Sequence, residues 1–355
     1  DRGKDPLTYL YIKLLFVESI KLVYDKQRIY KNIPQIMTKD NKKITEKEME
    51  DSILRLGYLL EQRVEVVLEK NAYFVTTNDA YPDPVTGKSR EIDINALSAF
   101  KLSKDLDFLF SRLLCECENN HQPVVFFVKD SPVSFLNSNY LKCAGLPVQF
   151  INNKDITIKG TSQKSNYEYS DLPDFLNIEK FHHYCKDPVS SQYCSFNRKN
   201  DKSPWIAYHE ETHHNSLNNL IFALEAKINE YYDDYIIPEK DEIDQINIEI
   251  YYPVLILQGP LHGARIQKGK LKLKKEKHIR YIKEHFSKDK KDTYIIDVIT
   301  EKYLSKYLKV IEEEMTRMQN KLKRKKKIVR ASLDTLVEKA KKKKKTETFR
   351  DIFEF

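Results

Sequence analysis

Acidic side chains alternate with apolar ones in two neighbouring segments of the chain. The first segment, Arg90–Ala96, contains Asp93, and the second, Leu114–Asn119, contains Glu116 and Glu118. Such alternation is typical of β-strands, and it places Glu116 and Glu118 on one face of their strand. A buried carboxylate without a partner costs several kcal/mol or takes up a proton, whereas a divalent cation can join carboxylates at a strand edge. The pattern therefore predicts that Asp93 and Glu116 are a pair of metal ligands.

Together with the loop Tyr81–Lys88, which contains Pro and Gly, these segments resemble the PD-(D/E)XK, or restriction-endonuclease-like, nuclease superfamily. In that superfamily an Asp on one strand and a (D/E)-x-K motif on the next bind Mg²⁺ and activate water against a phosphodiester. The resemblance implies that Asp93 and Glu116 hold Mg²⁺, with Mn²⁺ as a substitute and the Cys117 carbonyl completing the coordination. Glu118 stands where Lys is usual, and some restriction enzymes of this fold use Glu there. Its implied role is to orient or deprotonate the attacking water.

The superfamily often carries a further Glu on a helix before the first strand. A helix is predicted from Thr45 to Asn71, because apolar residues recur there at helical spacing. Glu61 lies beside this apolar stripe and is the candidate for an outer-sphere ligand or a ligand of a second metal ion. Gln122 and Arg90, which flank the two acidic segments, are the candidate contacts to nucleic acid in the core.

The remaining pattern predicts an α/β fold. Beyond the two acidic segments, strands are predicted at 72–77, 124–128, 147–151, 246–257, 261–266 and 293–299, and helices at 7–30, 134–143, 203–232 and 301–318. With the resemblance, this order implies a restriction-endonuclease-like core, a central mixed sheet flanked by helices, with an inserted cap region and a basic helical tail. The expected divisions are an N-terminal helix and linker at 1–45, the first half of the core at 46–151, the insertion at 152–240, the second half of the core at 241–318, and the tail at 319–355.

The charge of the chain favours a polyanionic partner. Its 355 residues carry a net charge of +8, and the segments Lys321–Lys327 and Lys339–Lys345 are dense in Lys and Arg. Runs of like charge are usually solvated, and the functional alternative is an arm that neutralises phosphates. The residues expected in such an arm are Lys323, Arg324, Lys325 and Lys326. Nucleic acid, DNA rather than RNA, is the expected partner.

No apolar run in the sequence reaches the length of a membrane span, and residues 7–24, which come closest, contain Lys13, Glu18 and Lys21. No membrane partner is therefore expected. The five cysteines lack a disulfide framework pattern, which suits a reducing compartment. The expected location is the cytoplasm, with the nucleoid or nucleus as alternatives, and the sequence leaves the oligomeric state open.

Two other functions fit parts of the sequence. His209–His213 matches H-E-x-x-H, in which His209 and His213 on one helix would hold Zn²⁺ and Glu210 would act as the base of a hydrolase. The polar residues within and after the motif favour a chance match, and His182 and His183 are interpreted as loop residues. The second alternative is a nucleic-acid-binding protein of the same fold with an inactive site. The preferred hypothesis is metal-dependent, endonuclease-like hydrolysis of nucleic-acid phosphodiester bonds.

Overall fold

The structure is a computed structural model that describes residues 43–53, 58–83, 86–103, 107–129, 140–152, 168–186, 188–209, 213–233, 245–287 and 290–342. The chain divides into two compact units, Asp1–Leu56 and Gly57–Phe355. In the first unit, α2 (Glu46–Ile53) begins with a capping box: the Glu48 N–H donates to Thr45 Oγ1 at 3.3 Å, and the Thr45 N–H donates to Glu48 Oε2 at 2.8 Å. The helix predicted at 7–30 lies outside the described residues.

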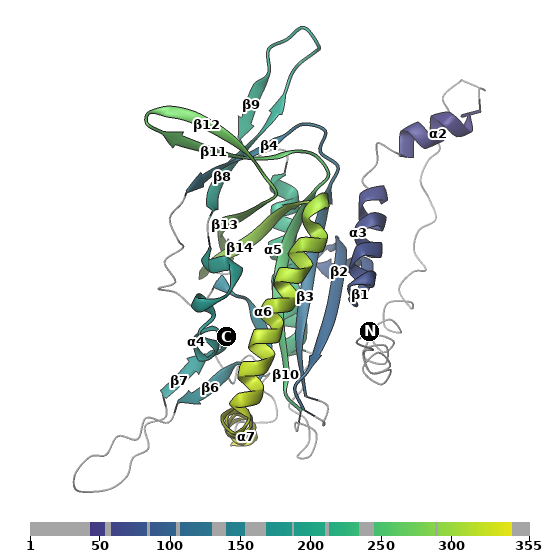
Figure 1. The fold of residues 1–355 in the computed structure, drawn as a ribbon. Coiled ribbons are helices and arrows are strands. Elements are labelled where there is room, and N and C mark those ends of the chain that lie inside the picture. The colour runs from purple at the N-terminus through teal and green to yellow at the C-terminus, as the bar shows by residue number, and fades with distance from the viewer. Residues whose placement is uncertain are drawn as a thin grey trace, which may run out of the picture. The chain divides into compact units, whose positions relative to one another are not determined.

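A mixed sheet of 12 strands, counted over the described residues, forms the centre of the second unit (Figure 1). Its order is β1-β2-β3-β10-β14-β13-β8-β4-β11-β12, with β5 paired to β10 and β9 paired to β8. The strands are β1 (Phe74–Pro82), β2 (Ser89–Lys101), β3 (Phe108–Glu118), β4 (Val124–Lys129), β5 (Cys143–Leu146), β8 (Val189–Asn197), β9 (Ile206–His209), β10 (Asn247–Leu257), β11 (Leu261–Gln267), β12 (Lys270–Glu276), β13 (His278–Ser287) and β14 (Lys290–Thr300). The strands β6 (Gln149–Asn152) and β7 (Glu168–Asp171) form a separate small sheet.

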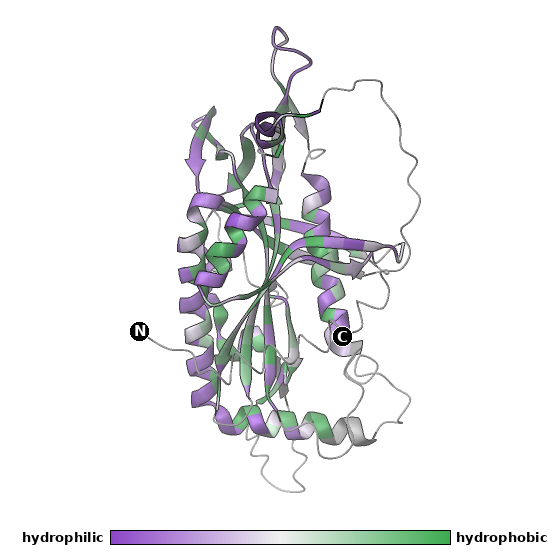
Figure 2. Cartoon of the chain, turned by 90° about the vertical axis from the view of Figure 1, so that its right-hand side faces the viewer, coloured by the Kyte–Doolittle hydropathy of each residue, from purple (hydrophilic) through white to green (hydrophobic). Residues whose placement is uncertain are grey.

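Helices cover both faces of the large sheet, as the predicted α/β class requires. On one face, α3 (Tyr58–Lys70) and α6 (Leu304–Arg324) pack against a core that includes Cys115 and Cys117 of β3. On the other face, α5 (His214–Asp233) packs against a second core that includes Leu114. In Figure 2 the strands in the middle of the sheet are largely hydrophobic, whereas the helices carry hydrophilic stretches. The predicted alternation along β3 is thus confirmed, with the cysteines on the α3 side and the neighbouring acids on the α5 side.

Strand β10 lies in the middle of the sheet although it contains Pro253, which cannot donate a backbone hydrogen bond. The edge of β10 away from β3 changes partner at this residue. β5 pairs along Asn247–Ile250, and β14 pairs from Val254 onward. Pro253 therefore falls between two ladders, at a place where no strand hydrogen bond is lost.

Several predicted elements were wrong. The helix expected at 203–232 is the strand β9 followed by α5, and the helix expected at 134–143 falls mostly outside the described residues and ends in β5. The irregular stretch expected at 152–202 contributes β8, which lies between β13 and β4 in the large sheet. Strand β12 was missed because its residues are almost all exposed, so its Lys-rich sequence has no buried apolar face to reveal it.

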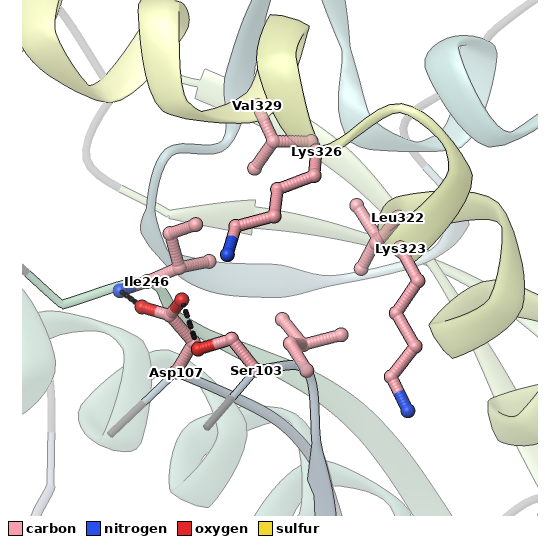
Figure 3. A pocket seen from close by; sticks show the side chains of 8 residues that line it. Ser103, Asp107, Ile246, Leu322, Lys323, Lys326 and Val329 are labelled. Atoms are coloured by element: carbon pink, nitrogen blue, oxygen red, sulfur yellow. Dashed lines mark hydrogen bonds between the residues drawn. The ribbon is translucent and has the colours of Figure 1, made fainter. Parts of the chain in front are cut away.

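The basic segment near the C-terminus is helical and attached to the sheet. α6 continues through residue 319, and α7 (Lys326–Lys342) follows it at the end of the sheet where β3 begins (Figure 1). Arg330 of α7 pairs with the buried Asp107 at 3.0 Å. Figure 3 shows Lys323 and Lys326 lining a small surface pocket beside Asp107, whose carboxylate also accepts hydrogen bonds from Ile246 and Ser103. Among the described helices, none is both long and apolar enough to cross a membrane.

Candidate active site

The four acids predicted from the sequence come together at one end of the sheet. Glu61 lies in the first turn of α3, Asp93 lies on β2, and Glu116 and Glu118 lie at the end of β3. The pairing of β2 with β3 runs up to Ile94 opposite Cys115, so Asp93 is one residue further on, level with Glu116. There the Cys117 N–H donates to Asp93 Oδ2 at 2.7 Å. Where the backbone pairing of β2 with β3 ends, the Asp93 carboxylate thus accepts the hydrogen bond of the Cys117 N–H.

Burial and mutual repulsion raise the pKa values of three of these carboxyl groups. Burial, with a contribution from Asp93, raises the pKa of Glu61 to about 7. Burial, followed by repulsion from Asp93 and Glu118, raises the pKa of Glu116 to about 9. Burial also raises the pKa of Asp93, against the opposing effect of the Cys117 N–H. In each of the three groups burial is the largest cause, and the neighbouring carboxylates add to it.

Glu116 carries the clearest sign that a ligand belongs at this cluster. Its side chain is buried, and its Oε1 atom has no hydrogen-bond partner among the described residues. Burying an oxygen without a hydrogen-bond donor is costly. The other polar atoms of the cluster are carboxylate oxygens, which are the ligand atoms that Mg²⁺ prefers. The residues present therefore fit a hard divalent cation.

The start of α5 forms a wall beside the acids. His213, Ser216 and Asn219 recur every three residues and face β3 together. Ser216 Oγ donates to Glu118 Oε1, the Asn219 side chain hydrogen-bonds to Glu116, and His213 Nδ1 lies 3.6 Å from Glu118 Oε1. Burial alone would raise the pKa of Glu118, but His213 and Ser216 outweigh it and the net shift is downward. Glu118 is thus the member of the cluster that stays ionised most readily.

These three residues were missed as site residues by the sequence reasoning. The helix was expected to begin eleven residues earlier, near Ser203, so its true first turn was not recognised. His213 was considered only as a zinc ligand. A signal was present in the three-residue spacing of polar side chains on an otherwise apolar helix, but the same spacing occurs on many solvated helices.

The other predicted contact residues have mixed positions. Arg90 donates to Asp83 and, at 3.0 Å, to Asn219 Oδ1, so it reaches Glu116 through one amide. Gln122 is exposed in the turn after β3. Cys117 reaches Asp93 through its N–H, and the metal-binding role of its carbonyl stays a prediction.

The predicted basic arm lies far from the acids. Lys325 donates to the Phe175 carbonyl at 3.0 Å, and Lys321 donates to the Leu176 carbonyl, so both cap the end of α4 (Leu172–Leu176). Arg330 reaches Asp107, which precedes β3, whereas Glu118 ends it. At about 3.3 Å per strand residue, the two ends of β3 are roughly 30 Å apart. Lys323, Arg324 and Lys326 are exposed at the end remote from the acids.

The H-E-x-x-H hypothesis requires His209 and His213 on one helix, and the structure places them otherwise. His209 ends the strand β9, and His213 precedes α5, so the two histidines do not share one helical face. Glu210, Glu211 and Thr212 lie outside the described residues. Among the described residues, the helix that would hold both histidines is therefore not found.

A second group of ionisable side chains lies under α6, and we call it the His183 cluster: His183, His278, Asp297, Tyr307 and Glu314. His183 donates from Nδ1 to Glu314 Oε2 at 2.8 Å and from Nε2 to Asp297 Oδ2 at 2.9 Å. Asp297 also accepts from Tyr307 at 2.6 Å and lies 2.6 Å from His278 Nε2. Burial alone would lower the pKa of His183, but Asp297 and Glu314 raise it to about 9.

Two sets of residues here have the composition of a metal site: His182, His183 and Glu314, and His183, His278 and Asp297. The hydrogen bonds favour a different interpretation. Both nitrogens of His183 already face carboxylates, and Nδ1 of His182 accepts from the Tyr184 N–H, so the His182 proton is on Nε2. A protonated His183 between two buried acids accounts for the cluster without an ion.

A cation held by Glu116 would bind more tightly as pH rises. Glu116, with a pKa of about 9, holds a proton at mildly acidic pH and would have to lose it before it could coordinate an ion. Glu61, with a pKa of about 7, would add negative charge from the outer sphere once it is ionised. Calorimetric titration in two buffers with different ionisation enthalpies would measure the protons released per ion. An affinity that stays constant from about pH 6 to pH 9 would contradict the proposed ligand set.

Comparison with protein-family models, curated proteins and solved structures finds no match. The functional assignment therefore rests on the geometry of the site.

Proposed function

We propose that this chain is a metal-dependent nuclease that hydrolyses phosphodiester bonds in nucleic acid, with DNA as the expected substrate. One observation carries the proposal: Glu61, Asp93, Glu116 and Glu118 converge from three elements around a buried carboxylate oxygen with no hydrogen-bond partner among the described residues. The element order supports the restriction-endonuclease-like resemblance. A helix, α3, precedes the acid-bearing strands β2 and β3, and the buried strand β4 follows them, whereas α5 and β10 come later in the chain, after β5 to β9.

Asp93 and Glu116 would hold the ion, with the Cys117 carbonyl beside them and Glu61 in the outer sphere. When bound, Mg²⁺ would stabilise the charge that develops at phosphorus and lower the pKa of the attacking water. The remaining chemistry belongs to the side chains. Glu118, kept ionised by His213 and Ser216, is placed to orient the water and accept its proton.

His213 lies next to Glu118, the residue at which this sequence departs from the usual (D/E)-x-K motif. A Lys at the position of Glu118 would supply a positive charge next to the attacked phosphate, and Glu cannot. The imidazole of His213, with Nδ1 3.6 Å from Glu118 Oε1, acts with Ser216 to lower the pKa of Glu118 and so keeps a carboxylate available at this corner of the site. We infer that the Glu118–His213 pair takes over the work of the missing Lys.

The variant Glu118→Gln is expected to lower single-turnover cleavage by about 10²-fold or more while leaving Mg²⁺ affinity within a few-fold, because it removes the proton acceptor and not a ligand. His213→Asn should lower the rate in the same direction, because it removes a group that lowers the pKa of Glu118. Supercoiled-plasmid nicking with Mg²⁺, Mn²⁺ or chelator measures the activity. Glu69→Gln, an exposed acid on α3, is the control for loss of one charge.

Each outcome of that assay bears on a different part of the proposal. If Glu118→Gln binds metal and cleaves like the wild type, the Glu118–His213 pair plays no part in the chemistry. If the wild-type protein binds nucleic acid but never cleaves it with any divalent ion, the inactive binding protein of the same fold is the better assignment.

A further inference from the structure

Strands β11 and β12 form a two-stranded ribbon whose two faces differ in chemistry. The turn between them is Lys268–Gly269, with φ values of 51° and 72°, the left-handed conformation that tight hairpins require. The register pairs Arg265 with Lys272 and Gln267 with Lys270. Cross-strand partners share a face, so Arg265, Lys270, Lys272 and Lys274 lie on the same side of the ribbon. We call this side the basic face.

The opposite side of the ribbon carries apolar side chains that are open to solvent near the turn, and Lys275 nearer the base. Ile266 is 72% exposed, Leu271 58% and Leu273 59%. Every residue of β12 except the last is exposed. The outer part of the ribbon therefore does not contribute to the core, and core packing does not explain its composition.

The basic face concentrates exposed positive charge along β12. Lys270, Lys272 and Lys274 stand at alternate positions of this strand, so their ammonium groups lie on one side of it and repel one another. The Glu276 carboxylate lies 3.2 Å from Lys274. A polyanion laid along this face would relieve the repulsion and release its own counterions.

The base of the ribbon is fixed next to the carboxylates. The Gln258 N–H donates to the Glu118 carbonyl at 3.0 Å, and the Gly259 N–H donates to Asn120 Oδ1 at 2.8 Å. A Cβ atom at Gly259 would lie 2.0 Å from the Asn120 carbonyl oxygen, so only Gly permits this approach. Two residues after Gly259, β11 begins. The ribbon thus starts at the strand ends that carry Glu116 and Glu118, and Figure 1 shows it at the end of the sheet opposite to α7.

We propose that the basic face of the β11–β12 ribbon binds the phosphate backbone of a nucleic acid duplex and guides it to the carboxylates. This rests on the proposed nuclease function and identifies the ribbon, and not the basic segment of α6 and α7, as the substrate-binding element. Charge complementarity selects the partner. A two-stranded ribbon also has the dimensions that the major groove of duplex DNA admits.

The test compares two variants that each lose three exposed lysines. The ribbon variant is Lys270→Ser, Lys272→Ser and Lys274→Ser, and the tail variant is Lys323→Ser, Lys326→Ser and Lys327→Ser. Binding to a short fluorescent DNA duplex is measured by anisotropy without divalent ions, across a range of salt concentrations. The same measurement with an RNA duplex distinguishes which backbone the ribbon accepts. Thermal melting verifies that both variants remain folded.

The ribbon variant is expected to bind at least about tenfold more weakly, with a log affinity versus log salt slope less steep by about 2 to 3, since each lost phosphate contact removes about 0.9. The tail variant should bind as the wild type does. Equal losses in the two variants, or no loss in the ribbon variant, would overturn the proposal. Cleavage is scored separately: ribbon-dependent binding without cleavage rejects the nuclease function alone, and cleavage with unchanged binding rejects the ribbon alone.

Discussion

Glu116→Gln is expected to lower metal-dependent cleavage by at least about 10²-fold and, in the same protein, to raise the melting temperature of the metal-free form. Activity falls because a ligand is lost, and a metal contributes several kcal/mol of charge stabilisation in the transition state. Stability rises because the amide keeps the shape of Glu116 and cannot ionise, whereas the buried carboxyl group, whose Oε1 has no partner among the described residues, must take up a proton when the metal-free chain folds.

The pH dependence of this stability effect has a definite sign. The pKa of Glu116 rises from an ordinary 4.5 to about 9 on folding. The folded protein then binds more protons than the unfolded one, so the metal-free wild type loses stability as pH rises from about 4.5 to about 9. The stabilisation by Glu116→Gln should accordingly be small at pH 5 and large at pH 9.

Thermal melting with chelator across this pH range, beside plasmid cleavage with Mg²⁺, measures both effects. Asp93→Asn should also abolish cleavage, but with a smaller gain in stability, because Asp93 accepts the hydrogen bond of Cys117. Glu69→Gln controls for the loss of one exposed acid. A Glu116→Gln protein that cleaves at the wild-type rate would remove the metal ligand assignment.

His183→Ala is expected to be the most destabilising single substitution considered for this chain, by about 3–5 kcal/mol, which is the cost of leaving a buried charge unpaired. The imidazole joins Asp297 and Glu314, both of which are buried. For a unit of this size, the melting temperature should fall on the order of 10 °C. His121→Ala, at an exposed turn, is the matched control.

The His183 cluster also predicts the pH range in which His183→Ala loses stability relative to the wild type. The pKa of His183 is raised from 6.5 to about 9, so its contribution is complete below about pH 6.5 and is lost as pH rises through 9. The pKa values of Asp297 and Glu314 are lowered, so their contribution is present above their ordinary values and is lost as pH falls. The gap between wild type and His183→Ala should be widest between about pH 4.5 and 6.5. If His183 instead holds an ion, dialysis against chelator would destabilise the wild type alone.

The part of the site that could be predicted comes from two strands close in sequence. Strand alternation fixes the side of β3 that carries Glu116 and Glu118, and the short connection from β2 brings Asp93 opposite. The His183 cluster could not be predicted in the same way, because its members come from four segments that only the folded chain brings together. The same limit applies to His213, which meets Glu118 across almost one hundred residues of sequence.

The fold was predictable where apolar periodicity was strong and unpredictable where it was weak. Buried β10 is a long apolar run and amphipathic α6 has a clear helical period, and the sequence located both. β12 and β9 are exposed strands whose pairing depends on neighbours, so local composition carries little information about them.

The continuity of α6 into α7 has a consequence for cooperativity of folding. The polypeptide beyond Gln319 includes Leu322, Val329 and Leu333, which are buried in the same core as α3, and Arg330, which neutralises the buried Asp107. A chain shortened at this point would lose core volume and leave an acid unpaired at the start of β3. Its defects in nucleic-acid binding would then report on global unfolding. Because this Lys-rich segment also stabilises the core, deleting it would change both the charge and the stability of the protein. Point substitution of the exposed lysines changes the charge alone.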